Sequence, residues 1–249
     1  MFEEPFRLME EVAIRHSYVQ EKLQKGQPVI AVPFNEGVLL LGFAPQPGKI
    51  AEIYDRIAMG GLGHPADVER LRMTLLEMAH MEGFNRSASD VNLLRLLQFG
   101  IAPALKQNFE ELQRSPYLVQ LILTELDRDG KPNFYRLNYD GYWETFDHGT
   151  VIAGNSDVAE WIGKEIEKTA FAEMPLESAF VKALELWREG QQHSVGEDDE
   201  EPMTLEYAFD RWPLEAAVLN STSPRKVLYK RLSPEQIEQG KSQVLKAEA

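Results

Sequence analysis

The chain has 249 residues, of which 43% are hydrophobic and 27% are charged, as in ordinary folded proteins. This composition excludes wholesale disorder, and the length allows one large domain or two small ones with a sizeable core. The sequence holds 26 Lys and Arg against 40 Asp and Glu, a formal net charge of -14. We expect no nucleic-acid partner, because affinity for phosphate backbones comes largely from basic side chains.

Cysteine is absent from the sequence. Its absence excludes disulfides, cysteine metal ligands and a cysteine nucleophile, and is typical of a reducing compartment. Apolar runs such as residues 38–41 are too short to span a bilayer. Residues 1–5 carry neither a basic start nor a long apolar stretch. We therefore expect a cytoplasmic protein with no signal peptide and no membrane partner.

The first part of the chain is predicted to form a helix and two hairpins. Apolar residues at helical spacing predict a helix over residues 7–25, which Gly26 ends. The strands of the two hairpins are predicted at residues 29–32 and 38–43 and at residues 49–54 and 56–62.

Two amphipathic segments follow, and each has one apolar face at helical spacing. The faces contain Val68, Leu71, Leu75 and Met78, and then Val91, Leu94, Leu97, Ile101 and Leu105. Ser87, three residues before Asp90, predicts a helix start there. Later strands are predicted at residues 117–126, 133–139 and 150–153, and later helices at residues 158–169 and 176–187.

A polar stretch at residues 190–212 interrupts this pattern, and we interpret it as a linker or insertion. Its acidic run, residues 197–201, is typical of a solvated loop, with a partner-contacting segment as the alternative. We expect residues 196–201 to project outward or to be disordered. A late hairpin is predicted at residues 214–219 and 226–232, with a short polar helix from Ser233. Because strands and helices come in blocks, the order favours an α+β layered fold over alternating βαβ units.

None of the common catalytic or metal-binding motifs is complete. No two of the five histidines stand at the helical spacing that pairs metal ligands; they are His16, His64, His80, His148 and His193. No Gly-x-Ser-x-Gly elbow occurs. The glycines at residues 60–63 lack the Gly-Lys-Ser/Thr ending of a phosphate loop and indicate a tight turn. Residues 127–130 lack the glutamate of a calcium loop and predict a hairpin turn. We expect no metal and no cofactor.

Lys49 has two interpretations. It begins an apolar strand after a break at Pro47 and Gly48. It is either a surface lysine that discourages edge pairing of the strand, or a cation in a pocket that binds an anionic group.

The sequence around Lys49 resembles the central motif of bacterial α-type subunits of the 20S proteasome. The resemblance is carried by residues 49–58 (KIAEIYDRIA) and 60–63 (GGLG), with further matches at 69–72, 87–91, 135–141, 213–219 and 226–232. It covers about residues 7–239. It implies an α+β fold, the four-layer αββα sandwich of the N-terminal-nucleophile hydrolases. The implied parts are a gate segment and ring-contact helix at 1–26, the αββα core at 27–189, the acidic linker or insertion at 190–212, and a C-terminal hairpin, short helix and tail at 213–249.

In this family, β-type subunits carry a catalytic threonine at a mature N-terminus and α-type subunits lack it. Threonine catalysis needs a hydroxyl and a free α-amino group on one residue. The matching position here is Gln27, followed by Pro28, and neither has a hydroxyl. The family's acidic partner would fall near Phe43. The resemblance therefore implies a subunit of a threonine-type endopeptidase complex that has no catalytic residue and is not an enzyme by itself.

The resemblance also implies sites and partners. Lys49 would bind the C-terminal carboxylate of a ring ATPase activator's tail in a pocket between subunits, with Gly63 at the floor of that pocket. The pore gate would be formed by Met1, Phe2, Glu3, Glu4, Pro5 and Phe6. The implied partners are further copies of the chain in a heptameric ring and the β-type subunits. The implied function is an outer ring that gates substrate entry to the β-subunit proteolytic chamber.

Two alternatives stay open. One is a divergent, self-standing N-terminal-nucleophile hydrolase, which would need cleavage just before a Thr or Ser. The other is a scaffold ring with a non-proteasomal partner.

Overall fold

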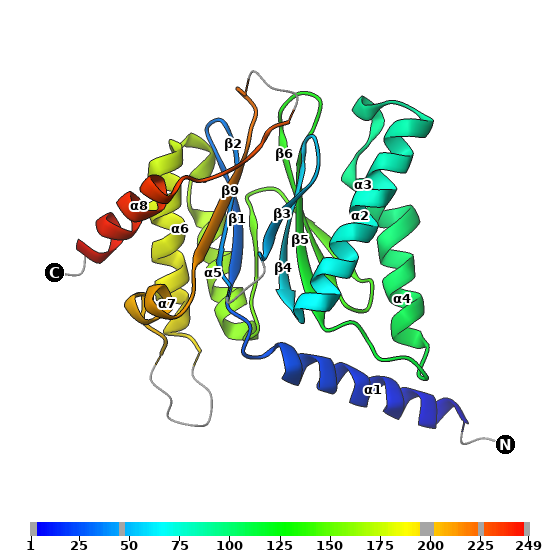
Figure 1. The fold of residues 1–249 in the computed structure, drawn as a ribbon. Coiled ribbons are helices and arrows are strands. Elements are labelled where there is room, and N and C mark those ends of the chain that lie inside the picture. Colours follow the sequence, from blue (N-terminus) through cyan, green and yellow to red (C-terminus); the bar gives the residue numbers. More distant parts are fainter. Residues whose placement is uncertain (1–3, 45–47, 195–201, 224–226, 247–249) are drawn as a thin grey trace.

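The structure is a computed structural model that describes residues 4–44, 48–194, 202–223 and 227–246 (Figure 1). One five-stranded sheet has the order β10 (Tyr229–Arg231), β9 (Leu214–Asn220), β2 (Gly37–Phe43), β1 (Val29–Phe34) and β8 (Thr150–Ile152). The other has the order β3 (Ile50–Tyr54), β4 (Ile57–Gly63), β5 (Val119–Leu126), β6 (Pro132–Asn138) and β7 (Trp143–Phe146). Every pair of neighbouring strands is antiparallel.

Helices cover the outer faces of both sheets, which gives the four-layer α+β sandwich expected from the sequence (Figure 1). The second sheet is covered by α2 (Pro65–Asn85), α3 (Leu93–Leu96), a π-helical turn (Leu97–Ile101) and α4 (Ala102–Glu110). The first sheet is covered by α5 (Ser156–Lys168), α6 (Leu176–Gln191) and α8 (Pro234–Lys246), with α7 (Leu205–Arg211) at one end. The N-terminal helix α1 (Glu4–Leu23) extends away from one end of the sandwich.

Strand β1 shows why these residues form a central layer. All six of its residues are buried, and successive side chains point to opposite faces. Val29 belongs to the core between the two sheets, whereas Ile30 belongs to the core under α5 and α6. A strand buried on both faces requires an apolar run and not an alternating pattern, which explains the continuous apolar sequence here.

Four features differ from the elements predicted by the sequence. Strand β7 was not predicted, because it is short and only partly buried. The prediction that Leu94 faces the core was wrong, since it is exposed while Leu93 and Leu96 are buried. Asn92 and not Ser87 caps α3, and Ser87 caps a 3-10 turn (Ala88–Asp90). The stretch at residues 190–212 contains α7, while its acidic run lies outside the described residues.

The outer edges of β3 and β10 meet along one flank of the sandwich. The Leu228 amide donates to the Asp55 carbonyl over 3.0 Å. The Tyr229 hydroxyl donates to the Ile50 carbonyl over 3.4 Å, and the Ile50 amide donates to Glu215 Oε2 over 3.1 Å. An open sheet edge exposes unpaired backbone groups. Here, side chains of the first sheet bind part of the β3 edge, and the two sheets are joined along this flank.

Candidate functional site

Lys49 lies between the start of β1 and the start of β3. Its partly buried ammonium donates a hydrogen bond to the Gln27 carbonyl over 3.0 Å. The side-chain oxygen Oε1 of Gln27 is also buried, and it accepts no hydrogen bond within the described part of the chain. Gly26 follows α1, and its carbonyl accepts a hydrogen bond from the Gly154 amide over 2.9 Å.

Glu215 supplies the carboxylate of this site, and we had not singled it out from the sequence. It lies on β9 opposite Gly42, on the same face of the strand as Ala217 and Leu219. Its Oε2 accepts the Ile50 amide, and a Cβ built on Gly48 would lie only 3.0 Å from the same oxygen. The carboxylate therefore binds the backbone amide on one side of Lys49 and lies beside Gly48 on the other. The signal was present in the sequence, because Glu215 is the charged residue within the apolar strand β9.

Two opposing effects set the charge of Lys49. Burial lowers its pKa from 10.5 to about 8, because the ammonium loses hydration, while the negative charge of Glu215 raises the pKa and limits this decrease. Glu215 also raises the pKa of Tyr229, for which burial is the larger cause. The site is a partly desolvated cation with a carboxylate nearby.

Phe43, the position of the expected acidic partner, has a different role. It is fully buried under the helices of the first sheet, with its ring centroid 4.8 Å from that of Trp187 and 5.1 Å from that of Phe209. Aromatic pairs at this distance stabilise a core. No charge at this position can reach Lys49, and the carboxylate near Lys49 comes from the neighbouring strand β9.

The glycines of β4 lie at different distances from Lys49. The Gly61 amide donates to the Lys49 carbonyl over 2.8 Å, which places Gly61 directly beside it. Gly63 lies two residues further along β4, where its φ is +132° and an added Cβ would lie 1.9 Å from the Leu118 carbonyl oxygen. The fold itself therefore requires glycine at position 63.

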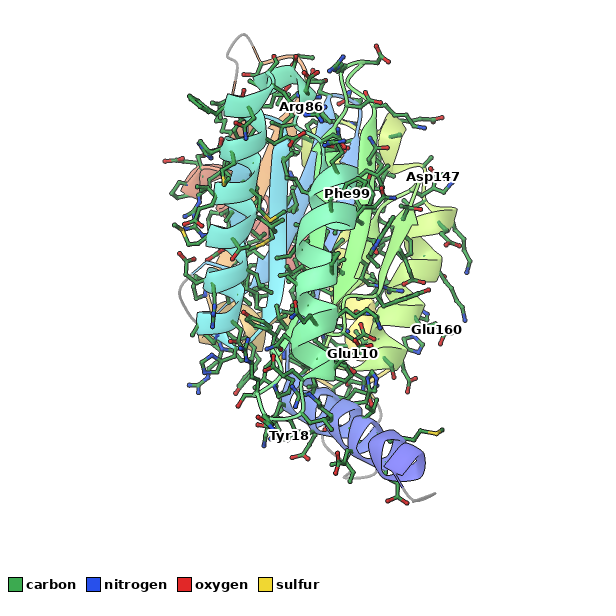
Figure 2. The ribbon with its side chains drawn as sticks, turned by 90° about the vertical axis from the view of Figure 1, so that its right-hand side faces the viewer. Tyr18, Arg86, Phe99, Glu110, Asp147 and Glu160 are labelled. Carbon is green, nitrogen blue, oxygen red and sulfur yellow. The ribbon has the colours of Figure 1, made fainter. Side chains whose placement is uncertain are left out.

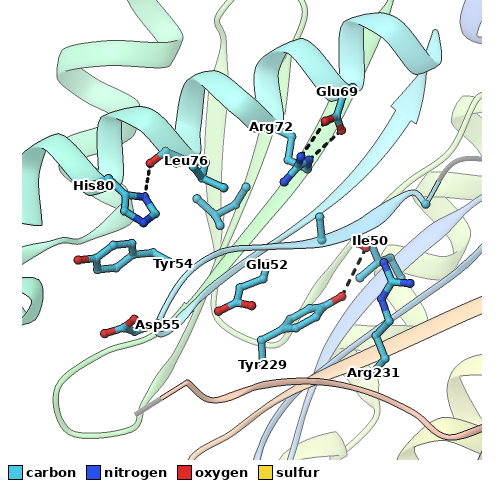
Figure 3. Close-up of a pocket in the computed structure, with 13 residues that line it drawn as sticks. Ile50, Glu52, Tyr54, Asp55, Glu69, Arg72, Leu76, His80, Tyr229 and Arg231 are labelled. Atoms are coloured by element: carbon cyan, nitrogen blue, oxygen red, sulfur yellow. Dashed lines mark hydrogen bonds and ion pairs between the residues drawn. The ribbon is translucent and has the colours of Figure 1, made fainter.

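A groove of about 620 Å³ runs beside the Lys49 segment, between α2 and the edges of β3 and β10 (Figure 3). Gly48 and Ile50 line it, so it shares its wall with the two neighbours of Lys49. Its charged lining consists of Glu52, Asp55, Glu69, Arg72 and Arg231. Arg72 is held by Glu69 at 2.7 Å. Burial, followed by the charge of Asp55, raises the pKa of Glu52.

The N-terminal helix is held by its second half. Arg15 is only 9% exposed, and its Nη2 donates to the carbonyls of Asn108 and Glu111 over 3.1 and 3.4 Å. His16 Nδ1 lies 3.0 Å from the Tyr139 hydroxyl. Of the residues expected to form a gate, Met1, Phe2 and Glu3 lie outside the described residues, and Glu4, Pro5 and Phe6 belong to the first turns of α1.

The helical layer over the second sheet carries several large apolar side chains that are exposed. Phe84 at the end of α2 is 92% exposed, Phe99 in the π-helical turn is 75% exposed, and Met81 is 65% exposed. Figure 2 shows Phe99 on the outer side of this layer. Large exposed apolar side chains of this kind mark interaction surfaces.

Within the described part of the chain, no three His, Asp or Glu side chains are grouped so that they could hold a metal ion. None of the described helices combines the length and the apolar character needed to cross a bilayer.

Comparison with known proteins gives one consistent match. A family model described as Proteasome subunit matches residues 23–200. Proteasome subunit alpha 2 of Rhodococcus erythropolis is similar to this chain, with 28% identity over 230 residues, which cover 90% of the chain and 86% of the relative. Proteasome subunit alpha of Mycolicibacterium vanbaalenii is 29% identical over 241 residues, which cover 94% of the chain and 89% of the relative.

Proposed function

The chain belongs to the proteasome subunit family, as an α-type member, and on this premise we propose that it is a non-catalytic subunit of a cytoplasmic 20S core particle. It forms the outer ring with further copies of itself, gates substrate entry to the β-subunit chamber and docks a ring ATPase activator. One observation carries this proposal most directly. The position that the resemblance assigns to the nucleophile holds Gln27, whose side chain has no hydroxyl, and Lys49 lies beside it.

The chemistry at Gln27 supports the non-catalytic role. A threonine-type protease needs a hydroxyl nucleophile and a free amine that removes its proton. Gln27 has an amide side chain and no hydroxyl. The lysine that would assist a nucleophile donates instead to the Gln27 carbonyl.

The environment of Lys49 supports docking of a carboxylate. An ammonium has three N–H donors, and the structure assigns one of them to the Gln27 carbonyl. Partial burial strengthens a charge-assisted hydrogen bond to a terminal carboxylate, relative to one on the open surface. The tail of an activator ATPase carries such a group.

The exposed apolar side chains on the outer surface of the α2–α4 layer support a protein partner in the particle. Phe84 lies at the end of α2 and Phe99 in the π-helical turn, and both are large and exposed. Aromatic side chains are enriched in the buried centres of protein interfaces. We assign this surface to contact with the β-type subunit.

Native mass spectrometry with a peptide-hydrolysis assay tests the proposal. The chain is measured alone and after co-expression with the β-type subunit from the same source. We expect a closed ring, with seven copies of the 28.4 kDa chain, that is inactive alone and supports hydrolysis only with the β-type subunit. A chain that hydrolyses peptides alone would be a self-standing hydrolase, and a ring that binds no β-type subunit would be a scaffold.

Removal of residues 1–6 tests the gate. We expect the truncated chain to assemble with the β-type subunit as before and to hydrolyse peptides faster, because the entry pore is no longer closed. An unchanged rate in an intact particle would show that these residues do not form the gate.

A further inference from the structure

Glu215 occupies an unusual place for a carboxylate. It projects from β9 on the face that packs between the sheets, where its neighbours Ala217 and Leu219 are fully buried. The side chain itself is half-buried. Its oxygen Oε2 accepts the Ile50 amide at 3.1 Å, and its negative charge acts on Lys49.

The hydrogen bond alone does not explain the choice of glutamate. A glutamine at position 215 would offer the same oxygen to the Ile50 amide without a charge. The feature that requires a carboxylate is the ammonium of Lys49, since the Glu215 side chain binds the Ile50 amide on one side of this residue and lies beside Gly48 on the other. Burial disfavours the charged form of this lysine, so it would be partly neutral near physiological pH without a nearby negative charge.

We propose that Glu215 is the resident counter-ion of the Lys49 site: it keeps the ammonium charged while no ligand is bound. A neutral amine would not form an ion pair with an incoming carboxylate. An ammonium that the nearby Glu215 keeps charged can pair with the carboxylate of a ligand when that ligand arrives. This inference deepens the proposed docking function and rests on it for the identity of the ligand.

Other charged groups lie near residues 48–50, and their effects on Lys49 have to be distinguished from the effect of Glu215. Glu52 lies on β3 and Tyr229 and Arg231 lie on β10, along the groove that Gly48 and Ile50 line (Figure 3). Among them, Glu52 carries the same type of charge three residues from Lys49, and Glu215 is the charge that acts on the Lys49 pKa. Glu52→Gln is therefore the matched control for Glu215→Gln.

The charge of Lys49 can be measured in the full chain by trace acetylation. Wild type, Glu215→Gln and Glu52→Gln are labelled with acetic anhydride from about pH 6 to about pH 10, and modification of Lys49 is quantified by mass spectrometry. We expect the titration midpoint of Lys49 to fall below the wild-type value of about 8 in Glu215→Gln and to stay there in Glu52→Gln. Glutamine keeps the oxygen that binds the Ile50 amide, and an unchanged thermal midpoint confirms the fold. An unchanged titration of Lys49 in folded Glu215→Gln would overturn the inference.

A second readout uses N-acetyl-leucine, with N-acetyl-leucinamide as its uncharged control. At about pH 6.5, where Lys49 is charged in both proteins, Glu215→Gln should bind the carboxylate about threefold more tightly, because one repelling charge is gone. Above about pH 8 the order should reverse, because the variant lysine is neutral there. Suppose that neither the wild type nor a variant binds N-acetyl-leucine, although the titration midpoint of Lys49 falls in Glu215→Gln. The proposed docking function is then wrong, and the counter-ion role of Glu215 stands. Binding that depends equally on pH in wild type and Glu215→Gln counts against the counter-ion role.

Discussion

Substitution of Arg15 by alanine should release the N-terminal helix from the body of the subunit. The guanidinium donates to the carbonyls of Asn108 and Glu111, at the C-terminal end of α4, and lies 5.5 Å from the centroid of the Phe109 ring. The last carbonyls of a helix lack partners within it and carry partial negative charge. Arg15 therefore links α1 to the one end of α4 that favours a cation.

The size of the effect follows from these contacts. A hydrogen bond from a charged donor contributes about 1.5–3 kcal/mol, and a desolvated cation–π contact contributes about 1–2 kcal/mol. The bond to Glu111 is long at 3.4 Å, and such contributions are not additive. We expect the free energy of local opening of α1 to fall by about 2–4 kcal/mol, which raises the opening equilibrium about 30-fold to 1000-fold.

Native-state hydrogen exchange on the full chain measures this opening. In Arg15→Ala, amide protection should fall in α1 and in the last turn of α4 and should stay unchanged in β1 and β2. Lys164→Ala is the matched control, because Lys164 forms an ion pair with Glu160 on an exposed helix face, where solvent screens the interaction and it contributes little to stability. Unchanged protection of α1 in Arg15→Ala would refute the reasoning and would mean that the buried Val19 and Leu23 hold the helix alone.

Three further substitutions separate assembly, charge and backbone effects. Phe84→Asp should change the free energy of unfolding by about 0.5 kcal/mol or less, since the side chain is 92% exposed, and should abolish co-purification with the β-type subunit. Lys49→Met removes a base whose pKa is lowered by folding to about 8. As the pH rises from 8 to 10.5, the free energy of unfolding of the wild-type protein should therefore increase by up to about 3 kcal/mol, because the unfolded chain still binds the proton that the folded chain has lost. The variant should not show this increase, and urea unfolding at each pH measures the difference. Gly63→Ala should lower the free energy of unfolding by about 3 kcal/mol or more, because φ at this position is +132° and the new Cβ would clash with the Leu118 carbonyl. Its control, Gly163→Ala in α5, has 3.9 Å of space to Val151 and should stabilise the chain.

The elements with strong periodicity were predictable from the sequence. The two early hairpins, α2, α5 and the start of α6 lie within a few residues of their predicted positions. Leu94 was misplaced because the segment begins as a helix at Leu93, capped by Asn92, and then widens into a π-helical turn, so that a single helical period does not apply to it. Gly100 permits this turn, since a Cβ there would lie 1.7 Å from Met78 Cε.

The candidate site was predictable only in part. Lys49 stands out in the sequence, and the structure places it beside Gln27, the position that the resemblance indicated. Glu215 lies 166 residues further along the chain and is brought to Lys49 by the pairing of β2 with β9. Strand order determines such a contact, and local sequence spacing carries no information about it. The position of Gly61 beside Lys49 depends in the same way on the register of β3 against β4.

The bonds between β3 and β10 have a mechanical consequence for the whole subunit. Because Leu228 is tied to Asp55 and Tyr229 is tied to Ile50, the two sheets are fastened together along that flank. Ile50 pairs with Gly60 of β4 and also bonds to Tyr229 and Glu215 of the first sheet. The backbone next to Lys49 is therefore positioned by both sheets together, so that a substitution in either sheet is expected to shift it.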